Sequence, residues 1–243
     1  MPRLTVFAGI NGAGKTTLYN YLSKKDTLSL GKRVCPDEIL QNFKGDWRDS
    51  GDQFKSGKIA ILEIRENIAK QHSFNWELTL LTTAVLSYLK KAKEQGFVVN
   101  VNFIGVEDLQ QSLDRIKNRV DKGGHDVEKE LVEMRYKRQF ENFSEVFEVV
   151  DGILFYDNAD TMRLIGGYID KTLFMTDTRP KWAEKIIYQY DCFAREYQEM
   201  REGKEMVVDE KATKLDKPVK YELGSMYEYG ELTFVEKTDR EKE

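Results

Sequence analysis

The chain has 243 residues, of which 40% are hydrophobic, enough for one medium-sized domain with or without an appendage. Its 38 basic and 42 acidic side chains nearly cancel, and the formal net charge of −4 gives no electrostatic reason to expect a nucleic-acid partner. Cys35 and Cys192 are the two cysteines, and their wide separation argues against a zinc site or a disulfide framework. No stretch reaches the roughly 18 apolar residues that span a bilayer, so we expect a cytoplasmic protein without a membrane partner.

The N-terminal half alternates strand-like and helix-like segments. Residues 3–8 are apolar and end at a glycine, which predicts a buried strand, and residues 15–25 predict the helix that follows it. The next expected elements are a strand at 32–35, an amphipathic helix at 52–72, a strand at 73–80, a helix closed by a glycine at 83–96 and a strand at 97–105.

The pattern continues with helices at 106–120 and 127–142, joined by a flexible segment, and with a strand at 149–158. Strands that alternate with helices behind an opening strand–glycine loop–helix predict an α/β fold of the P-loop NTPase or kinase type. We expect a parallel sheet flanked by helices, a lid hinged at Gly123–Gly124 and a C-terminal appendage.

The C-terminal part has a looser pattern. Residues 162–176 predict a hairpin around Gly166–Gly167, and residues 180–200 predict a helix that starts at Pro180. The last stretch, from about residue 202, is polar, charged and poor in aliphatic residues. We therefore divide the chain into a P-loop domain at 1–188 and a peripheral extension at 189–243.

The segment that carries most chemical information is residues 9–16, Gly-Ile-Asn-Gly-Ala-Gly-Lys-Thr, which matches the phosphate-binding pattern G-x-x-x-x-G-K-[ST] between a predicted strand and helix. Glycines let backbone amides approach phosphate oxygens, and the helix N-terminus adds positive potential. We expect Lys15 to contact the β- and γ-phosphates of ATP and the Thr16 hydroxyl to ligate Mg²⁺. The predicted nucleotide-binding residues are Gly9, Asn11, Gly12, Ala13, Gly14, Lys15, Thr16, Thr17 and Asn158. Asn158 ends the late strand, where adenine-contacting loops often lie, but it is equally a simple strand-to-turn stop.

Two other P-loop classes do not fit. A transporter ATPase needs an L-S-G-G-Q signature and an Asp-Glu pair after a buried strand, whereas the pairs at 37–38 and 209–210 do not end convincing buried strands. A GTPase needs D-x-x-G and [NT]-K-x-D after apolar strands. The matching fragments at 121–124 and 213–216 instead follow an amphipathic helix and lie in the charged tail. A kinase of small molecules remains, which needs an acceptor-side carboxylate and cations over the phosphates.

Several further blocks resemble the zeta toxin family, mainly its short, single-domain members. In order they are "CPDEI" (35–39), "SGK" (56–58), "SFNWELTL" (73–80), "RIKNRVDKGGHDV" (115–127) with "RY" (135–136), and "YDN" (156–158). The likeness covers roughly residues 3–188. It implies a P-loop phosphotransferase that uses ATP to phosphorylate a UDP-amino sugar, as the studied toxins do. It also implies an antitoxin protein as partner, although a housekeeping kinase would have the same sequence features.

The resemblance places two carboxylates on the acceptor side. Asp37 follows the predicted second strand, where it would accept or orient the proton of the substrate hydroxyl; the alternative is a helix N-cap. Glu77 ends a strand among apolar neighbours and would bind the acceptor, the alternative being a solvent-facing strand residue. The sequence reads Glu-Leu-Thr here, where the family has Glu-Thr-Thr.

Arginines near the glycine hinge are the candidate lid residues. Arg115 and Arg119 are four residues apart on one helix face, and Arg119 and Arg135 flank Gly123–Gly124. Arginines that fold over ATP would stabilise charge on the transferring phosphoryl group. The alternative is an ordinary basic surface. The predicted catalytic set is thus Asp37, Lys15, Arg119 and Arg135. A second class of function stays open, namely a P-loop module that binds or slowly hydrolyses nucleotide and acts through a protein partner.

Overall fold

The computed structural model describes residues 1–25, 29–124 and 126–202. The predicted polar tail, including the fragment at 213–216, lies outside this part of the chain. Among the described residues, no helix has the length and apolar character that a membrane span would require.

A seven-stranded sheet forms the centre of the molecule, in the order β2-β3-β1-β4-β5-β6-β7. The first five strands of that order run parallel, and β6 and β7 are antiparallel additions at one edge. The sheet is therefore mixed, although its N-terminal five strands are parallel as expected. The strands are β1 (Arg3–Ala8), β2 (Lys32–Val34), β3 (Phe74–Leu78), β4 (Val98–Gly105), β5 (Gly152–Asp157), β6 (Arg163–Ile169) and β7 (Thr172–Met175).

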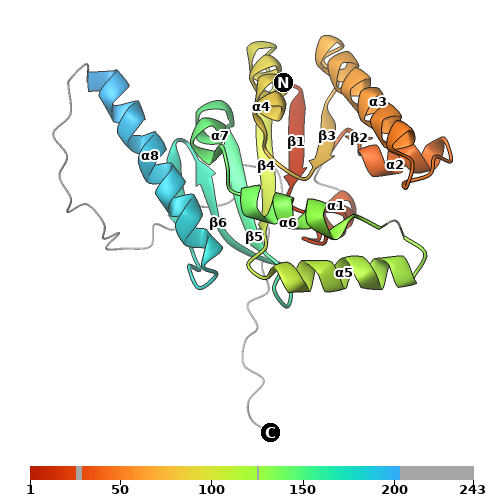
Figure 1. The fold of residues 1–243 in the computed structure, drawn as a ribbon. Coiled ribbons are helices and arrows are strands. Elements are labelled where there is room, and N and C mark those ends of the chain that lie inside the picture. Colours follow the sequence, from red (N-terminus) through yellow and green to blue (C-terminus); the bar gives the residue numbers. More distant parts are fainter. Residues whose placement is uncertain (26–28, 125, 203–243) are drawn as a thin grey trace, which may run out of the picture.

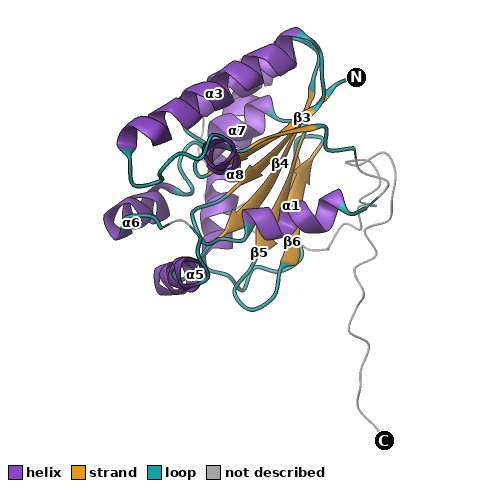
Figure 2. Cartoon of the chain, turned by 90° about the vertical axis from the view of Figure 1, so that its right-hand side faces the viewer, coloured by secondary structure: helices purple, strands orange, loops and turns teal. Residues whose placement is uncertain are grey.

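Helices cover the two faces of the sheet unequally. The helix that follows the P-loop packs on one face, while long helices cover the other (Figures 1 and 2). Two further helices lie beyond one end of the sheet (Figure 2). The helices are α1 (Lys15–Ser23), α2 (Pro36–Asn42), α3 (Ser50–Ala69), α4 (Thr83–Glu94), α5 (Leu109–Asp121), α6 (Lys129–Arg138), α7 (Phe143–Val149) and α8 (Trp182–Glu202).

Side-chain alternation along the strands builds two cores. On β4, Val99, Val101 and Phe103 face the larger core beneath α3, α4, α7 and α8, whereas Ile104 faces the smaller core around α1. Successive strand residues point to opposite faces, so strands covered on both sides are apolar along most of their length. The arrangement leaves the carboxyl ends of β1, β3 and β4 at one edge, where loops meet.

The hairpin turn lies elsewhere than the sequence predicts. Gly166 and Gly167 lie within β6, and the turn is formed by Asp170 and Lys171, whose φ angles are 50° and 64°. Two successive left-handed residues are the signature of a tight β-hairpin turn, which most often uses asparagine or glycine. The predicted turn is wrong because glycine, although common in turns, also occurs in strands where another chain segment packs closely. Here Gly167 is instead packed closely against Phe174 of β7, 2.7 Å from where a Cβ would lie.

The helix expected at 127–142 is in fact shorter, and a second helix was missed. Helix α6 ends at Arg138, and α7 begins after Asn142, whose φ of 63° is incompatible with a continuous helix. The last helix begins at Trp182 rather than Pro180. The boundary placed between 188 and 189 lies inside α8, and Phe193 beyond it is buried in the larger core.

Candidate functional site

A cleft of about 1420 Å³ lies at the carboxyl ends of the central strands. It is bordered by the P-loop, α2, the end of β3, α5, α6 and the loop after β5. Most residues predicted from the sequence line it together: Asn11, Gly12, Gly14, Lys15, Thr16, Thr17, Asp37, Glu77, Arg115, Arg119, Arg135 and Asn158. Gly9 and Ala13 do not line it; Gly9 lies against the backbone of Ile104 and Ala13 is fully buried.

The P-loop has the backbone that its glycines allow. Gly12 and Gly14 have φ angles of 78° and 107°, which side-chain-bearing residues rarely adopt. A Cβ on Gly12 would lie 2.6 Å from the carbonyl oxygen of Ser112 in α5. The Ser112 hydroxyl in turn donates to the carbonyl oxygen of Asn11. Helix α5 is thus pressed against the loop, which brings its arginines to the cleft.

Lys15 is a buried cation whose hydrogen-bond acceptors are backbone carbonyl oxygens. Its Nζ donates to the carbonyl oxygens of Gly9, at 2.8 Å, and Ile10, at 3.1 Å. Burial lowers the pKa of Lys15, and the negative charges of Glu77 and Asp37 partly oppose that shift. The ammonium lies in the phosphate loop with backbone carbonyls as its hydrogen-bond acceptors, a position from which it can contact a phosphate ligand.

Glu77 lies beside the P-loop threonine. Its carboxylate accepts from the Thr16 hydroxyl at 3.2 and 3.3 Å and from the Arg33 guanidinium at 2.6 Å. With 8% of its surface exposed, Glu77 is buried, which rules out the solvent-facing alternative. Sequence reasoning missed Arg33. The available signal was a cation in the short strand that neighbours the Glu77 strand.

These two oxygen-bearing groups suit a magnesium ion. Mg²⁺ prefers oxygen ligands and is usually held by one or two protein groups together with substrate phosphates. Thr16 and Glu77 supply a hydroxyl and a carboxylate within hydrogen-bond distance of each other at the P-loop. The described residues contain no cluster of three or more histidine, cysteine, aspartate or glutamate side chains that would hold a metal without a nucleotide.

Asp37 is the second residue of α2 and borders the cleft. Cys35 is the N-cap of this helix, so the capping alternative for Asp37 is wrong. The Asp37 charge raises the pKa of both Lys15 and Arg135, against the larger lowering by burial. Asp37 therefore faces the same space as the phosphate-side cations. Cys35 itself is unreactive, because burial and then Glu77 raise the pKa of its thiol to about 12.

The two arginines that the sequence predicts for a lid both border the cleft. Arg135 on α6 donates from Nη1 to the side-chain oxygen of Asn11 at 2.6 Å, and burial lowers the pKa of this guanidinium. Arg119 on α5 borders the same cleft, and its Nε and one Nη are buried without a hydrogen-bond partner. Unpaired buried donors of this kind are costly unless a ligand accepts from them. The half-buried state of both side chains argues against an ordinary basic surface.

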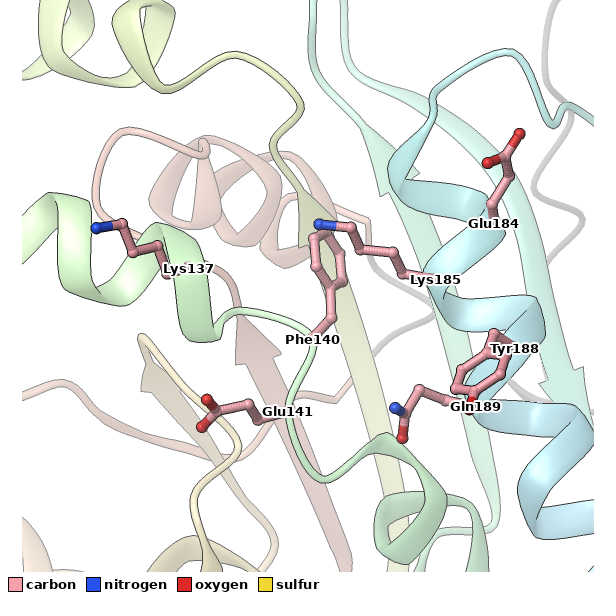
Figure 3. A pocket seen from close by; sticks show the side chains of 7 residues that line it. All are labelled: Lys137, Phe140, Glu141, Glu184, Lys185, Tyr188 and Gln189. Carbon is pink, nitrogen blue, oxygen red and sulfur yellow. The ribbon is translucent and has the colours of Figure 1, made fainter.

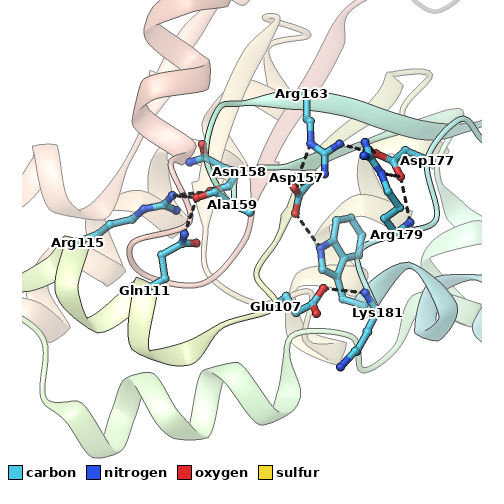
Figure 4. A network of polar contacts seen from close by, with 11 residues as sticks. Glu107, Gln111, Arg115, Asp157, Asn158, Ala159, Arg163, Asp177, Arg179 and Lys181 are labelled. Carbon is cyan, nitrogen blue, oxygen red and sulfur yellow. Dashed lines mark hydrogen bonds and ion pairs between the residues drawn. The ribbon is translucent and has the colours of Figure 1, made fainter.

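Arg115 and Asn158 brace the P-loop from the side of β5 (Figure 4). Arg115 donates to the carbonyl oxygens of Asn158 and Ala159 and, at 3.4 Å, of Gly12. The Asn158 amide donates to the carbonyl oxygen of Ala13 at 2.8 Å. Asn158 is thus more than a strand-to-turn stop, since it joins the loop after β5 to the phosphate loop.

A second, smaller hollow of about 360 Å³ lies on the surface between the end of α6 and α8 (Figure 3). Its side chains are of mixed charge, and Lys185 lies 5.2 Å from the centre of the Phe140 ring. It contains none of the residues predicted for phosphate chemistry. The large cleft is therefore the candidate site.

The chain is similar in sequence to a protein of Haemophilus influenzae. This uncharacterised protein is 32% identical over 130 residues, which cover 54% of this chain and 89% of that protein. The chain belongs to the same family. No model of a known protein family matches the sequence.

Solved structures give the fold a wider context. The AvrRxo1-ORF1:AvrRxo1-ORF2 complex with sulphate ions matches with a TM-score of 0.60 and 16% identity over 76% of this chain. The same complex with ATP gives a TM-score of 0.59 and 17% identity. A chain of the PezAT toxin–antitoxin system of Streptococcus pneumoniae gives 0.52 and 13% identity, covering 82% of this chain and 88% of that one. This chain spans 64% and 63% of the two AvrRxo1 chains. The chain therefore has the α/β fold of the P-loop type that the sequence predicts, and it shares this fold with the AvrRxo1 and PezAT chains.

Proposed function

We propose that this protein is an ATP-dependent kinase that transfers the γ-phosphoryl group to a hydroxyl of a small molecule. One observation carries the proposal. Lys15, Arg119 and Arg135 converge on one cleft, and none of the three forms an ion pair with a carboxylate of the described chain. Buried or half-buried cations without an ion-pair partner are stabilised when an anion of several charges binds to them. A triphosphate at a P-loop is such an anion.

The residues divide the work by position. We expect Lys15 and the P-loop amides to bind the β- and γ-phosphates, and Arg119 and Arg135 to stabilise charge on the transferring group. Thr16 and Glu77 would hold Mg²⁺, which when bound neutralises phosphate charge. Asp37 would orient the acceptor hydroxyl and accept its proton. We also expect Glu77 to contact the acceptor, since it lines the same cleft as Asp37.

For the acceptor, we propose a UDP-amino sugar as the first candidate, on the strength of the sequence blocks shared with zeta toxins. The cleft is large enough for two ligands, since its volume exceeds that of usual single-ligand pockets. Leu78 stands where zeta toxins have a hydroxyl-bearing threonine, which is a reason to test other acceptors as well. Nucleosides and other nucleotide sugars therefore belong in the same screen.

A small protein partner is the second part of the proposal. The solved structures with this fold include a two-protein AvrRxo1 complex and a chain described as part of a toxin–antitoxin system. A partner that covered the cleft would block access to the P-loop. Co-purification of this chain with the product of a neighbouring gene, followed by loss of nucleotide binding in the complex, would support this role.

Radiolabelled transfer is the deciding experiment. The purified protein is incubated with γ-labelled ATP, Mg²⁺ and a panel of nucleotide sugars and nucleosides, and labelled products are separated. We expect label on one acceptor and its loss in Asp37→Asn. Glu63→Gln, which removes an acidic side chain of α3 that pairs with Lys32, is the control. If no acceptor is labelled while Lys15-dependent hydrolysis persists, the kinase proposal is wrong, and the slow-hydrolysing module becomes the better description.

A further inference from the structure

Glu77 is held in place by a cation that the proposed reaction does not use. Arg33 extends from β2 and binds Glu77 through Nη2 at 2.6 Å and Glu38 of α2 through Nε at 2.5 Å. A third, longer contact joins Nη1 to the side-chain oxygen of Asn75 at 3.4 Å. The planar group also lies 3.7 Å from the centre of the Tyr19 ring on α1. Four elements therefore meet at one guanidinium.

The burial of this pair makes the contact with Glu77 strong and directional. The Arg33 and Glu77 side chains are each 9% exposed, whereas the Glu38 side chain is 46% exposed. Exposed ion pairs contribute little to stability, while a buried pair that loses one partner leaves a charge without compensation. Arg33 and Glu77 are thus the two groups of this network whose charges would be left buried if their contact were lost.

Glu77 is bound from two sides at once. Arg33 donates to Oε2, and the Thr16 hydroxyl reaches the same oxygen at 3.2 Å and Oε1 at 3.3 Å. A carboxylate that accepts hydrogen bonds from both sides cannot rotate freely, so its oxygens stay beside the Thr16 hydroxyl. Groups that orient a metal-side ligand in other proteins commonly change metal affinity by 10- to 100-fold when removed.

We propose that Arg33 is a positioning residue for the divalent-cation side of the site. By holding Glu77 against Thr16, it sets how strongly nucleotide affinity depends on Mg²⁺. The inference rests on the proposed function, because it assumes that ATP and Mg²⁺ bind at this P-loop. Arginine is suited to the role because its fork reaches Glu77 and Glu38 together while its face stacks on Tyr19, which a lysine cannot do.

The test measures binding rather than turnover. A fluorescent ATP analogue is titrated with Mg²⁺ present and again with EDTA, and the ratio of the two dissociation constants reports metal coupling. In Arg33→Lys, which keeps the charge, and in Arg33→Met we expect this ratio to fall about tenfold. Affinity in EDTA should change little. Lys32→Met, which removes the neighbouring cation of β2, is the matched control, and we expect its ratio to stay close to wild type, since Lys32 is half-exposed and pairs with Glu63.

A double variant shows whether Arg33 acts through Glu77. Glu77→Gln should lower the ratio by itself, and adding Arg33→Lys should lower it no further, because the two side chains form one interacting unit. A folded Arg33→Lys protein with the wild-type ratio would overturn the inference, as would additive losses in the double variant. Circular dichroism checks folding, and Arg33→Lys serves if Arg33→Met does not fold. A wild-type protein that binds no nucleotide would instead overturn the proposed function itself, and this inference with it.

Discussion

The cations of the cleft and those at the β6–β7 hairpin and directly after it bind different kinds of partner. Arg163 of β6 binds Asp157 at 3.0 Å and also Asp177, and Asp177 is bound again by Arg179 at 2.7 Å (Figure 4). Asp157 also accepts a hydrogen bond from the indole N–H of Trp182 at 3.3 Å. In the cleft, Lys15 and Arg135 instead bind carbonyl and amide oxygens.

This difference separates structural charge from functional charge. The hairpin network is neutralised within itself, so it can stabilise the fold without a ligand. In the cleft, Lys15 and Arg135 are buried or half-buried without a direct ion pair to a described residue, and a bound polyphosphate would offset the cost of burying them. If this distinction is right, substitutions in the cleft change binding and turnover, and substitutions in the hairpin change stability.

The largest effect is expected at Lys15. Lys15→Met should reduce affinity for ATP by roughly 10²- to 10³-fold and abolish transfer, because it removes the cation at the phosphate loop. The free energy of unfolding of the unliganded variant should lie within about 1 kcal/mol of the wild-type value, because two hydrogen bonds are lost but a desolvated charge is also removed. Titration with a fluorescent ATP analogue and urea unfolding measure the two quantities. A Lys15→Met protein that loses stability but keeps its affinity for ATP would contradict the distinction between structural and functional charge.

Arg135 should affect turnover more than binding. Arg135→Lys keeps a charge but loses the planar fork, so we expect turnover to fall by about 10²-fold while ATP affinity changes only a few-fold. Steady-state kinetics with the acceptor found in the labelling screen measure this split. Lys137→Met on the same helix is the control, since Lys137 borders the surface hollow and not the cleft. Equal losses in both variants would mean that general surface charge is responsible.

Arg163 should show the opposite behaviour. Arg163→Met leaves Asp157, whose side chain is 3% exposed, with the Trp182 N–H and without its cation. We expect the free energy of unfolding to fall by about 2 kcal/mol, below the full cost of breaking a buried pair because Arg163 is itself 37% exposed. Urea unfolding measures it. ATP affinity at a temperature where both proteins are folded should remain near wild type, and a large loss of affinity would contradict the structural role.

The smallest effect concerns pH. Arg179, together with the backbone hydrogen bond it provides and the nearby Arg163, holds the pKa of Asp177 well below its usual 3.8. Because the folded pKa is the lower one, Asp177 adds stability above the unfolded pKa, and this contribution is lost as pH falls toward the folded value. The difference in unfolding free energy between wild type and Asp177→Asn should be constant between about pH 5 and 7 and shrink below about pH 4. A difference that grows on acidification would refute the assignment.

Local patterns predicted the P-loop well because its glycines, lysine and threonine act within one continuous segment. The same holds for β1, β4 and β5, whose apolar runs predict buried strands. The predictions failed where backbone geometry did not use its usual residues. Asp170 and Lys171 form a left-handed turn without glycine, and Asn142 breaks a helix by a single positive φ angle. Asparagine and aspartate tolerate the left-handed conformation without requiring it, and lysine is not a turn signal, so the sequence does not place these turns.

The sequence by itself determined the phosphate loop, its strand–loop–helix setting and the identity of the candidate carboxylates and arginines. Only the tertiary structure decided which of these charges meet. Glu77 contacts Thr16 because β3 pairs directly with β1, a neighbourhood created by the sheet order, and Arg33 reaches Glu77 because β2 lies on the other side of β3. Arg135 reaches Asn11 across 124 residues of chain for the same kind of reason. Side-chain partners depend on strand order and helix packing, and these are set by burial over the whole domain rather than by any local pattern.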